Sequence, residues 1–578
     1  WARLSQVAVH GAEYDSRERQ PHPKCLEGTR VDLLDYIYRL LNNREQSRLI
    51  WLHGTAGVGK SAVAFTVAER MRSLKVTEET NVEKRLAGTF FFSQKYTERC
   101  TTAYFFATLV YQLASNFPSI RADVSKSIRD NPALLDPSES LRVQVETLFL
   151  QPLRGLHLRL RGCQPLTFIV DALDECTSEF ELADLILSLA RVLHEPDLPV
   201  IHILLTSRSE LHICRTMENE EVRSLVIISL DSANVDNDIY IFLRNFFGQL
   251  GSRHLDFPQP STEQLERLAS RAGRRFIVAS TMMKFIDNED NDPYDQLMLM
   301  LELTSELLPG TEVFKFYDCI LSTCADPKRA YLHLSVVAAL TDPLPLSQIS
   351  TLLGPGLGKD VETTLMQLRS VVDIPADSTL PVNIYHSSIR DYVSDTLNCS
   401  LRQVHDMPSP HCLLAHSCFR LMMKGIPENA ALLDALSQLE TQSSAMEPEL
   451  PRALKYACRN WAVHLSRAPH PWDNKLDHIF HAFWNHRLLS WLELQWCLKG
   501  LQSCLVILSE GQKLAKVCIS NHSCHSSWKL ILLHSMSTVL SSSWTPFTCS
   551  PIKYNLLLFL TPKRRQCNHQ HPRPPPKC

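Results

Sequence analysis

Short apolar runs alternate with helix-like stretches over about the first 230 residues. Runs of this length are typical of strands that are buried on both faces of a parallel sheet. The stretches between them carry apolar residues at helical spacing, as in 60–74, where Val63 and Val67 share one face. The pattern predicts an α/β domain with a parallel five-stranded sheet. The five apolar runs lie at 48–53, 87–93, 166–170, 198–208 and 224–230.

The pattern changes in the second half of the chain. Over 312–400 it predicts a helix, a turn, two further helices, two short strands and a last helix, an order that fits a winged helix. Ser347 is expected to cap one of these helices. Apolar stripes over 401–500 then predict an all-helical region, in which the aromatic residues form a core.

Composition and charge narrow the classes of protein. The chain has 578 residues, 44% hydrophobic and 21% charged, with a formal net charge of −3 and 18 scattered Cys. We expect a cytoplasmic globular protein of about four domains, with reduced thiols and without a membrane partner. The segment 347–370 balances two bases against two acids, which argues against a DNA-reading helix. These are Lys359, Arg369, Asp360 and Glu362.

The two ends of the chain differ from the rest. Residues 1–27 lack an initiator Met, and they lack the charged and then apolar stretches of a secretory signal peptide. We therefore expect them to be a lead segment at the start of a fragment. Residues 501–578 hold one acidic residue against nine Lys or Arg, which fits a basic tail, a Cys/His metal module or a mistranslated sequence. We favour a disordered or mistranslated tail. The Cys/His cluster is Cys518, His522, Cys524 and His525, and its spacing lacks two separated ligand pairs.

The strongest chemical signal follows the first apolar run. Residues 54–61 match the phosphate-binding pattern G-x-x-x-x-G-K-[ST] in full, between a strand-like run and a helix-like stretch. The glycines let backbone N–H groups point at phosphate oxygens, Lys60 adds a charge at the β- and γ-phosphates, and Ser61 takes a position on Mg²⁺. The expected binding residues are Gly54, Thr55, Ala56, Gly57, Val58, Gly59, Lys60 and Ser61.

An acidic motif follows the third apolar run. Asp171 comes directly after it, at the sheet edge where parallel sheets bind ligands, and is expected to hold Mg²⁺ with Ser61. Either Asp174 or Glu175 would orient the attacking water. Arg208 ends the next run and would sense the γ-phosphate. The string Asn474–Asp477 resembles a guanine-reading motif but lies far away in a helical region, so we interpret it as a solvated turn.

These motifs resemble the fungal NACHT-type, nephrocystin-like NTPases of the STAND class of signalling ATPases. The resemblance runs over about residues 14–500 and includes GTAGVGKS, FIVDALDEC, LLTSR and AGRRFIVAS. It implies a switch that is closed with ADP and oligomeric with ATP, and that hydrolyses ATP slowly. It also implies that Thr29 and Arg30 contact the adenine end and that His386 contacts the β-phosphate of ADP. Many relatives outside the fungal group carry a Gly-x-Pro where this chain has 272–275, Ala-Gly-Arg-Arg, so the contact of that proline with the nucleotide does not carry over to this chain.

The expected organisation and function follow from these points. The leading hypothesis is an ATP-binding, slowly hydrolysing switch with an unidentified protein partner and no nucleic acid. Lys60, Asp174, Glu175 and Arg208 are its expected catalytic residues, ATP or ADP and Mg²⁺ its cofactors. The alternatives are a nucleotide-locked scaffold and a winged-helix transcription regulator. The expected parts are a lead segment (1–27), a NACHT P-loop domain (28–232), a helical domain (233–311), a winged helix (312–400), a helical arm (401–500) and the tail (501–578).

Overall fold

The protein is seen here in a computed structural model. It divides into two compact units, Trp1–Glu493 and Leu494–Cys578. The tail and its Cys/His cluster lie outside the described residues. The structure describes residues 1–20, 22–77, 83–222, 225–231, 235–288, 291–305, 307, 313–426, 451–488, 490–491 and 494.

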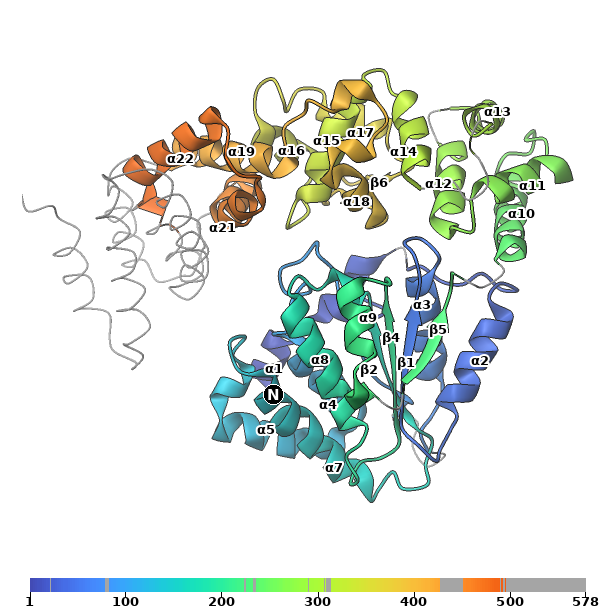
Figure 1. Cartoon of the computed structure of the whole chain (residues 1–578), viewed down its shortest axis with the longest axis vertical. Coiled ribbons are helices and arrows are strands. Elements are labelled where there is room, and N and C mark those ends of the chain that lie inside the picture. The colour runs from blue at the N-terminus through green and yellow to red at the C-terminus, as the bar shows by residue number, and fades with distance from the viewer. Residues whose placement is uncertain are drawn as a thin grey trace, which may run out of the picture. The chain divides into compact units, whose positions relative to one another are not determined.

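A five-stranded sheet forms the centre of the first half of the chain (Figure 1). All neighbouring strands run parallel, and their order across the sheet is β2-β3-β4-β1-β5. Each strand falls on one of the apolar runs, so the predicted α/β fold class with a parallel five-stranded sheet is confirmed. The strands are β1 (Arg48–His53), β2 (Leu86–Phe91), β3 (Leu166–Asp171), β4 (Ile201–Ser207) and β5 (Leu225–Ser229).

Helices cover both faces of this sheet, because successive strand residues point to opposite sides. In β1, Ile50 and Leu52 join one buried cluster with α2 (Val31–Leu41) and α3 (Lys60–Ser73). Leu49 and Trp51 join the other. That second face is covered by α4 (Phe105–Asn116), the π-helical turn η5 (Val145–Leu150), α7 (Gln151–His157) and α8 (Glu179–Val192). Shorter helices complete this half: α1 (Ala2–Val7), α5 (Arg121–Asp130), α6 (Leu141–Gln144) and α9 (Leu211–Met217).

The edge strand β2 is closed by side chains of α4. The Gln112 amide accepts from Thr89 N–H at 2.8 Å and donates to the Thr89 carbonyl at 2.8 Å. Asn116 accepts from Lys84 N–H at 2.9 Å and donates to its carbonyl at 2.8 Å. These amides replace a neighbouring strand, so the edge does not offer free pairing groups at Lys84 and Thr89.

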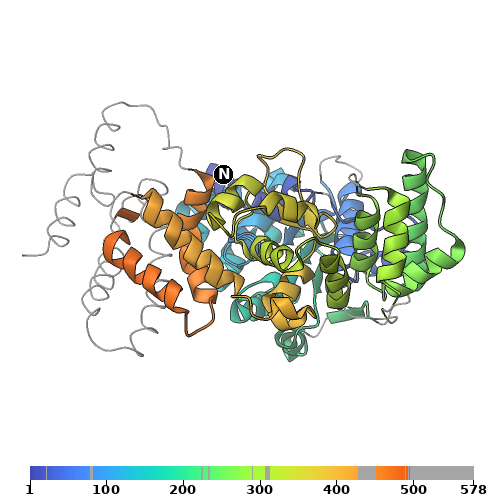
Figure 2. The same ribbon diagram turned by 90° about the horizontal axis from the view of Figure 1, so that it is seen from above.

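The next part of the chain is helical. Figures 1 and 2 show four helices that pack against one another. Arg275 ends the turn before the third of them, and Phe276 and Ile277 begin it. The four are α10 (Asp236–Arg253), α11 (Thr262–Arg271), α12 (Phe276–Ile286) and α13 (Pro293–Leu303).

Residues 313–394 form four helices, an antiparallel pair of short strands and a last helix, so one helix more than predicted precedes the strands. The winged-helix assignment of this segment stays a prediction. The predicted cap at Ser347 is wrong: α16 begins at Leu346 after Pro345, so Ser347 lies inside the helix, where its carbonyl accepts from the Thr351 hydroxyl at 2.8 Å. The elements are α14 (Val313–Ser322), α15 (Pro327–Ala339), α16 (Leu346–Leu353), α17 (Val361–Met366), β6 (Val372–Asp373), β7 (Asn383–Ile384) and α18 (Ser388–Ser394).

Three long helices follow, α19 (Pro410–Gly425), α21 (Arg452–Arg467) and α22 (Asn474–His486), and their aromatic residues pack together as predicted. The Asn474–Asp477 string is the first turn of α22, capped by Asp473, and not a separate turn; its polar residues are exposed, whereas Leu476 is buried. In the part of the chain that the structure describes, we find no helix long and apolar enough to cross a bilayer.

Candidate functional site

The phosphate-binding pattern forms the turn between β1 and α3, as the motif requires. Gly57 and Gly59 hold φ of +81° and +98°, a left-handed backbone that side chains rarely adopt. A Cβ on Gly57 would also collide with Ile277, whose N–H donates to the Gly57 carbonyl at 3.2 Å. Glycine is therefore required here by the backbone angle and by the close approach of α12.

Lys60 turns back over the loop. Its Nζ donates to the Gly54 carbonyl at 2.7 Å and to the Thr55 carbonyl at 2.8 Å. Burial lowers the pKa of Lys60, which Asp174 partly offsets. Asp231 fixes the loop from after β5, since its carboxylate accepts from the Thr55 N–H and hydroxyl, both at 2.9 Å. The loop thus has the form in which a lysine lies within reach of bound phosphates.

Asp171 is buried at the end of β3, with 3% of its surface exposed. Its carboxylate accepts from the Thr206 hydroxyl at 2.5 Å and also interacts with the Ser61 hydroxyl. Burial raises the pKa of Asp171, and Arg19 is the first of the groups that oppose this rise. A carboxylate beside a hydroxyl offers the hard oxygen ligands that Mg²⁺ prefers, and Mg²⁺ keeps several waters, so this pair fits the predicted metal position.

The two acids after β3 point to different partners, because the chain turns sharply at Ala172. Ala172 holds φ of +59°, and its N–H donates to Thr206 Oγ1 at 3.0 Å. Asp174 accepts from the Arg208 N–H at 2.9 Å, and Glu175 accepts from the Gln94 N–H at 3.0 Å. Such left-handed strain in a residue other than glycine costs about 1–3 kcal/mol and is typical of functional sites.

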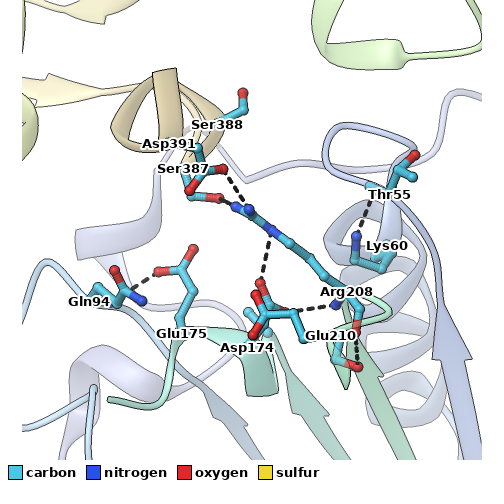
Figure 3. A network of polar contacts seen from close by, with 12 residues as sticks. Thr55, Lys60, Gln94, Asp174, Glu175, Arg208, Glu210, Ser387, Ser388 and Asp391 are labelled. Carbon is cyan, nitrogen blue, oxygen red and sulfur yellow. Dashed lines mark hydrogen bonds and ion pairs between the residues drawn. The ribbon is translucent and has the colours of Figure 1, made fainter. Parts of the chain in front are cut away.

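Arg208 joins the acidic motif to α18 (Figure 3). Its Nε lies 3.0 Å from Asp174 Oδ2, and its Nη1 lies 2.5 Å from Asp391 Oδ2. Its Nη2 donates to the Ser387 hydroxyl at 2.9 Å. Burial raises the pKa of Asp174 to about 6, although Arg208 acts against the rise. The whole fork of this guanidinium is therefore engaged, on both sides of the cavity.

A second ion pair also joins the acidic motif to α18. In this pair α18 supplies the arginine, whereas in the first pair it supplies the carboxylate. Arg390 Nη1 of α18 lies 3.9 Å from Glu175 Oε2, while its Nε donates to the Ala338 carbonyl at 3.2 Å. Lys95 adds a third link, since its buried Nζ donates to the Ile384 carbonyl of β7 at 2.8 Å. Burial lowers the pKa of Lys95 to about 8.

A cavity of about 460 Å³ collects these groups. Of the predicted site residues, Gly54, Thr55 and Val58 shape the loop without lining the cavity. The others line it: Thr29, Arg30, Ala56, Gly57, Gly59, Lys60, Ser61, Asp171, Asp174, Glu175, Arg208 and His386. Nine basic side chains, against the three carboxylates, make it suited to an anion. They are Arg19, Lys24, Arg30, Lys60, Lys95, Arg99, Arg208, Lys284 and Arg390.

Thr29 and Arg30 are both buried at one end of this cavity. Thr29 Oγ1 donates to the Leu26 carbonyl at 2.6 Å. Arg30 precedes α2 with φ of +57°, and its Nη2 donates to the Val58 carbonyl at 2.6 Å. Its guanidinium also lies 5.4 Å from the Phe276 ring centroid. Arg30 therefore supports the phosphate-binding loop from outside, and its contact with adenine stays a prediction.

His386 serves the start of α18 and lines the cavity. Its Nδ1 accepts from the Ser388 N–H at 3.1 Å and lies 2.7 Å from the Ser388 hydroxyl. Burial lowers the pKa of His386 to about 3, and Arg208 and Lys60 add to this effect. Because Nδ1 accepts, the neutral ring carries its proton on Nε2, which is free to donate to an anion.

Several residues that line the cavity belong to none of the motifs recognised in the sequence. Arg19 and Lys95 come from segments before the phosphate-binding loop and after β2, and Arg390 comes from α18. Phe276 and Ile277 line the cavity, whereas Gly273 and Arg274 line a separate open groove of about 840 Å³ between α10 and α11. No local spacing links such distant positions. Only the AGRRFIVAS string pointed to this part of the site, and those of its residues that line the cavity lie from Phe276 onward.

Comparisons with known proteins agree with this site over part of the chain. The family model described as "Nephrocystin 3, N-terminal" matches residues 33–208. No curated protein matches the chain. The matched segment includes the phosphate-binding loop, the acidic motif and Arg208.

Solved structures offer more distant similarities. One is the STAND protein with a tetratricopeptide repeat sensor from Pyrococcus horikoshii, at 13% identity and a TM-score of 0.36, over 87% of this chain and 66% of that one. A Walker-type ATPase of Pyrococcus abyssi has 15% identity and a TM-score of 0.33, over 65% and 99%. The Aeropyrum pernix ORC2 protein has 13% identity and a TM-score of 0.33, over 66% and 98%. The chain thus spans just under two thirds of the first of these proteins.

The family match, the strand order and the geometry of the loop concern the same residues. The loop joins the inner strand β1 to the helix α3. The acidic strand β3 is separated from β1 by one strand, β4. Residues 33–208 are therefore similar to the N-terminal segment of nephrocystin 3, and they carry the phosphate-binding loop and the acidic strand of a P-loop NTPase fold.

Proposed function

We propose that this protein is an ATP-binding, slowly hydrolysing signal-transduction switch of the STAND class. The observation that carries the proposal is the crossed pair of ion contacts between the NTPase domain and α18. Arg208 meets Asp391, and Glu175 meets Arg390. The residues expected to respond to the nucleotide are the same residues that hold the C-terminal segment.

Binding follows from the cavity. The backbone N–H groups of the loop, the positive end of α3 and Lys60 favour the phosphates of ATP or ADP. Neutral His386 adds a donor from the opposite wall. Ser61 and Asp171 would hold Mg²⁺, which neutralises phosphate charge when bound.

The arrangement also supports slow hydrolysis. A general base must be free to accept a proton from water. Glu175 is occupied by the Gln94 N–H and by Arg390, and Asp174 is occupied by Arg208. The residues of α18 therefore restrain Glu175 directly, through Arg390, and Asp174 indirectly, through the contact of Asp391 with Arg208. Opening of the cavity wall formed by α18 would release Glu175 and expose the surfaces on which an ATP-bound oligomer forms.

The decisive experiment uses the full chain and measures nucleotide content and oligomeric state. We expect the parent to retain ADP as a monomer and to assemble on addition of Mg-ATP. Asp391→Asn removes the charge that holds Arg208, so assembly should need about 10-fold less ATP, the effect of about 1.4 kcal/mol. Asp406→Asn is the matched control, because Asp406 is exposed on the same part of the chain. Lys60→Ala should bind neither nucleotide.

Two outcomes separate the switch from its alternatives. A parent that binds neither ADP nor Mg-ATP would contradict the whole proposal. A parent that holds ADP, never turns over and never assembles would favour the nucleotide-locked scaffold, which the engagement of both acids also supports. Glu175→Gln should abolish the slow turnover of a true switch, and it should leave the scaffold unchanged.

A further inference from the structure

One cation of the cavity wall comes from the segment that precedes the NTPase domain. Arg19 is the last residue of a short helical turn, η2 (Arg17–Arg19). It lines the same cavity as Lys60, Ser61 and Asp171. Its charge plays no part in the contacts that hold α18, so it is available for another role.

The segment that carries Arg19 is tied to the NTPase domain on both sides. Tyr14 N–H donates to the Thr89 hydroxyl of β2 at 3.0 Å. Cys25 N–H donates to the Thr66 hydroxyl of α3 at 3.0 Å. Ser16 caps the turn between them, accepting from the Glu18 N–H at 3.3 Å. Arg19 is therefore placed by the fold and not by a loose terminus.

The guanidinium of Arg19 is held in one orientation. Its central carbon lies 3.5 Å from the centroid of the Phe91 ring, at the end of β2. Its Nη1 donates to the Tyr14 carbonyl at 2.8 Å. An arginine has five N–H donors in a planar fork, and this bond uses one of them. Stacking fixes the plane at little further entropic cost, so the remaining donors are directed in advance.

The charge of Arg19 acts on the predicted magnesium position. Burial raises the pKa of Asp171, and Arg19 is the first of the groups that oppose this rise, ahead of Lys60. A guanidinium and Mg²⁺ beside one carboxylate repel each other, and a further anion that contacts both offsets this repulsion. The γ-phosphate of ATP is such an anion, and ADP lacks it.

We propose that Arg19 binds the γ-phosphate of ATP, so that the segment before the phosphate-binding loop distinguishes ATP from ADP. This inference rests on the proposed nucleotide function. It assigns a ligand contact to a residue outside the segment that matches the nephrocystin family. Phosphate is the ligand for which a planar, bidentate guanidinium is suited best.

The test measures the affinity of the full chain for two probes by calorimetry, Mg-ADP and the Mg complex of the β,γ-imido analogue of ATP. We expect Arg19→Gln to weaken the ATP analogue about 10-fold or more and Mg-ADP less than about 2-fold, as loss of one charge-assisted contact implies. Arg19→Lys should recover part of the loss, since the charge remains without the fork. Arg17→Gln is the matched control, because Arg17 lies exposed in the same turn.

Each remaining outcome decides against the inference. Equal weakening of both nucleotides would mean that Arg19 only balances Asp171 or supports the fold. Unchanged affinities of Arg19→Gln for both probes would exclude the contact. If Arg19→Gln does not fold, the ratio measured on Arg19→Lys decides in the same way. A parent that binds neither probe would remove the proposed function as well, whereas a parent that binds both leaves that function standing.

Discussion

Individual residues at the site are set by burial as much as by their chemical type. Asp171, Asp174 and His386 all line the same cavity, and burial shifts the pKa of each in the direction that favours its neutral form. Cations oppose this effect for the carboxylates and reinforce it for the imidazole. The site therefore favours a neutral histidine that donates a hydrogen bond, beside carboxylates that depend on their arginine partners for ionisation.

The pH dependence of stability tests the state of His386. Its pKa falls from 6.5 to about 3 on folding, so the unfolded chain binds a proton that the folded chain rejects. Its contribution to stability is full above pH 6.5 and is lost as the pH falls, by about 1 kcal/mol per pH unit. We expect His386→Gln to flatten the fall in the free energy of unfolding between pH 6.5 and about pH 4, in urea titrations.

The titration of Asp174 changes the stability with pH in the opposite direction to that of His386. The pKa of Asp174 rises from 3.8 to about 6, so the stability that it affects falls as the pH rises through that window. The comparison of His386→Gln with the parent cancels this contribution, because both chains retain Asp174. An identical pH profile of the two chains would show that folding does not lower the pKa of His386.

At the scale of elements, the β2 edge shows how side chains finish what a sheet leaves open. Gln112 pairs with both backbone groups of Thr89, and the pair is part of the strand that ends beside the cavity. We expect Gln112→Leu to lower the free energy of unfolding by about 1–3 kcal/mol, because a buried N–H and a buried carbonyl lose their partners. Urea unfolding monitored by circular dichroism measures this.

The matched change for that prediction is Gln249→Leu, on the exposed face of α10. Surface substitutions away from structural features usually change stability by less than about 0.5 kcal/mol. If Gln112→Leu costs no more than Gln249→Leu, water or another group satisfies Thr89, and the edge is open to other strands.

At the scale of the whole molecule, the NTPase segment contacts β7 and α18 through charged side chains. A bound nucleotide would compete for these side chains. Arg208 contacts Asp391, and Lys95 contacts the carbonyl of Ile384, both from the cavity wall. Paired buried charges gain little net energy, but separation of the partners is costly unless another ion replaces one of them. A phosphate is such a replacement for Asp391.

Hydrogen exchange of α18 tests this competition. We expect peptides over Ser388–Ser394 to exchange about 10-fold faster with Mg-ATP than with Mg-ADP, because loss of the Asp391 contact favours opening by about 1.4 kcal/mol. Peptides over α22, which packs against α19, should not change. Equal exchange of α18 with both nucleotides would mean that the contact with Arg208 does not respond to the γ-phosphate.

Sequence reasoning predicted the parts of the site that adjacent residues build. The phosphate-binding loop, the Asp171 motif and the strand that ends in Arg208 are local patterns, whose backbone requirements can be recognised in one segment. The five strands followed from apolar runs for the same reason. The predicted cap at Ser347 was wrong because the helix already begins at Leu346, with Pro345 at its N-cap position.

The sequence by itself thus determined the sheet, the loop and the identity of the acids, because these depend on the order and hydrophobicity of neighbouring residues. Only the tertiary structure decided the partners of those acids. Arg390 reaches Glu175 and Asp391 reaches Arg208 from about two hundred residues away, and Arg19 reaches the wall beside Asp171 from before the loop. Such contacts arise from the packing of whole elements, and charge alone does not choose among the chain's many Lys, Arg, Asp and Glu residues.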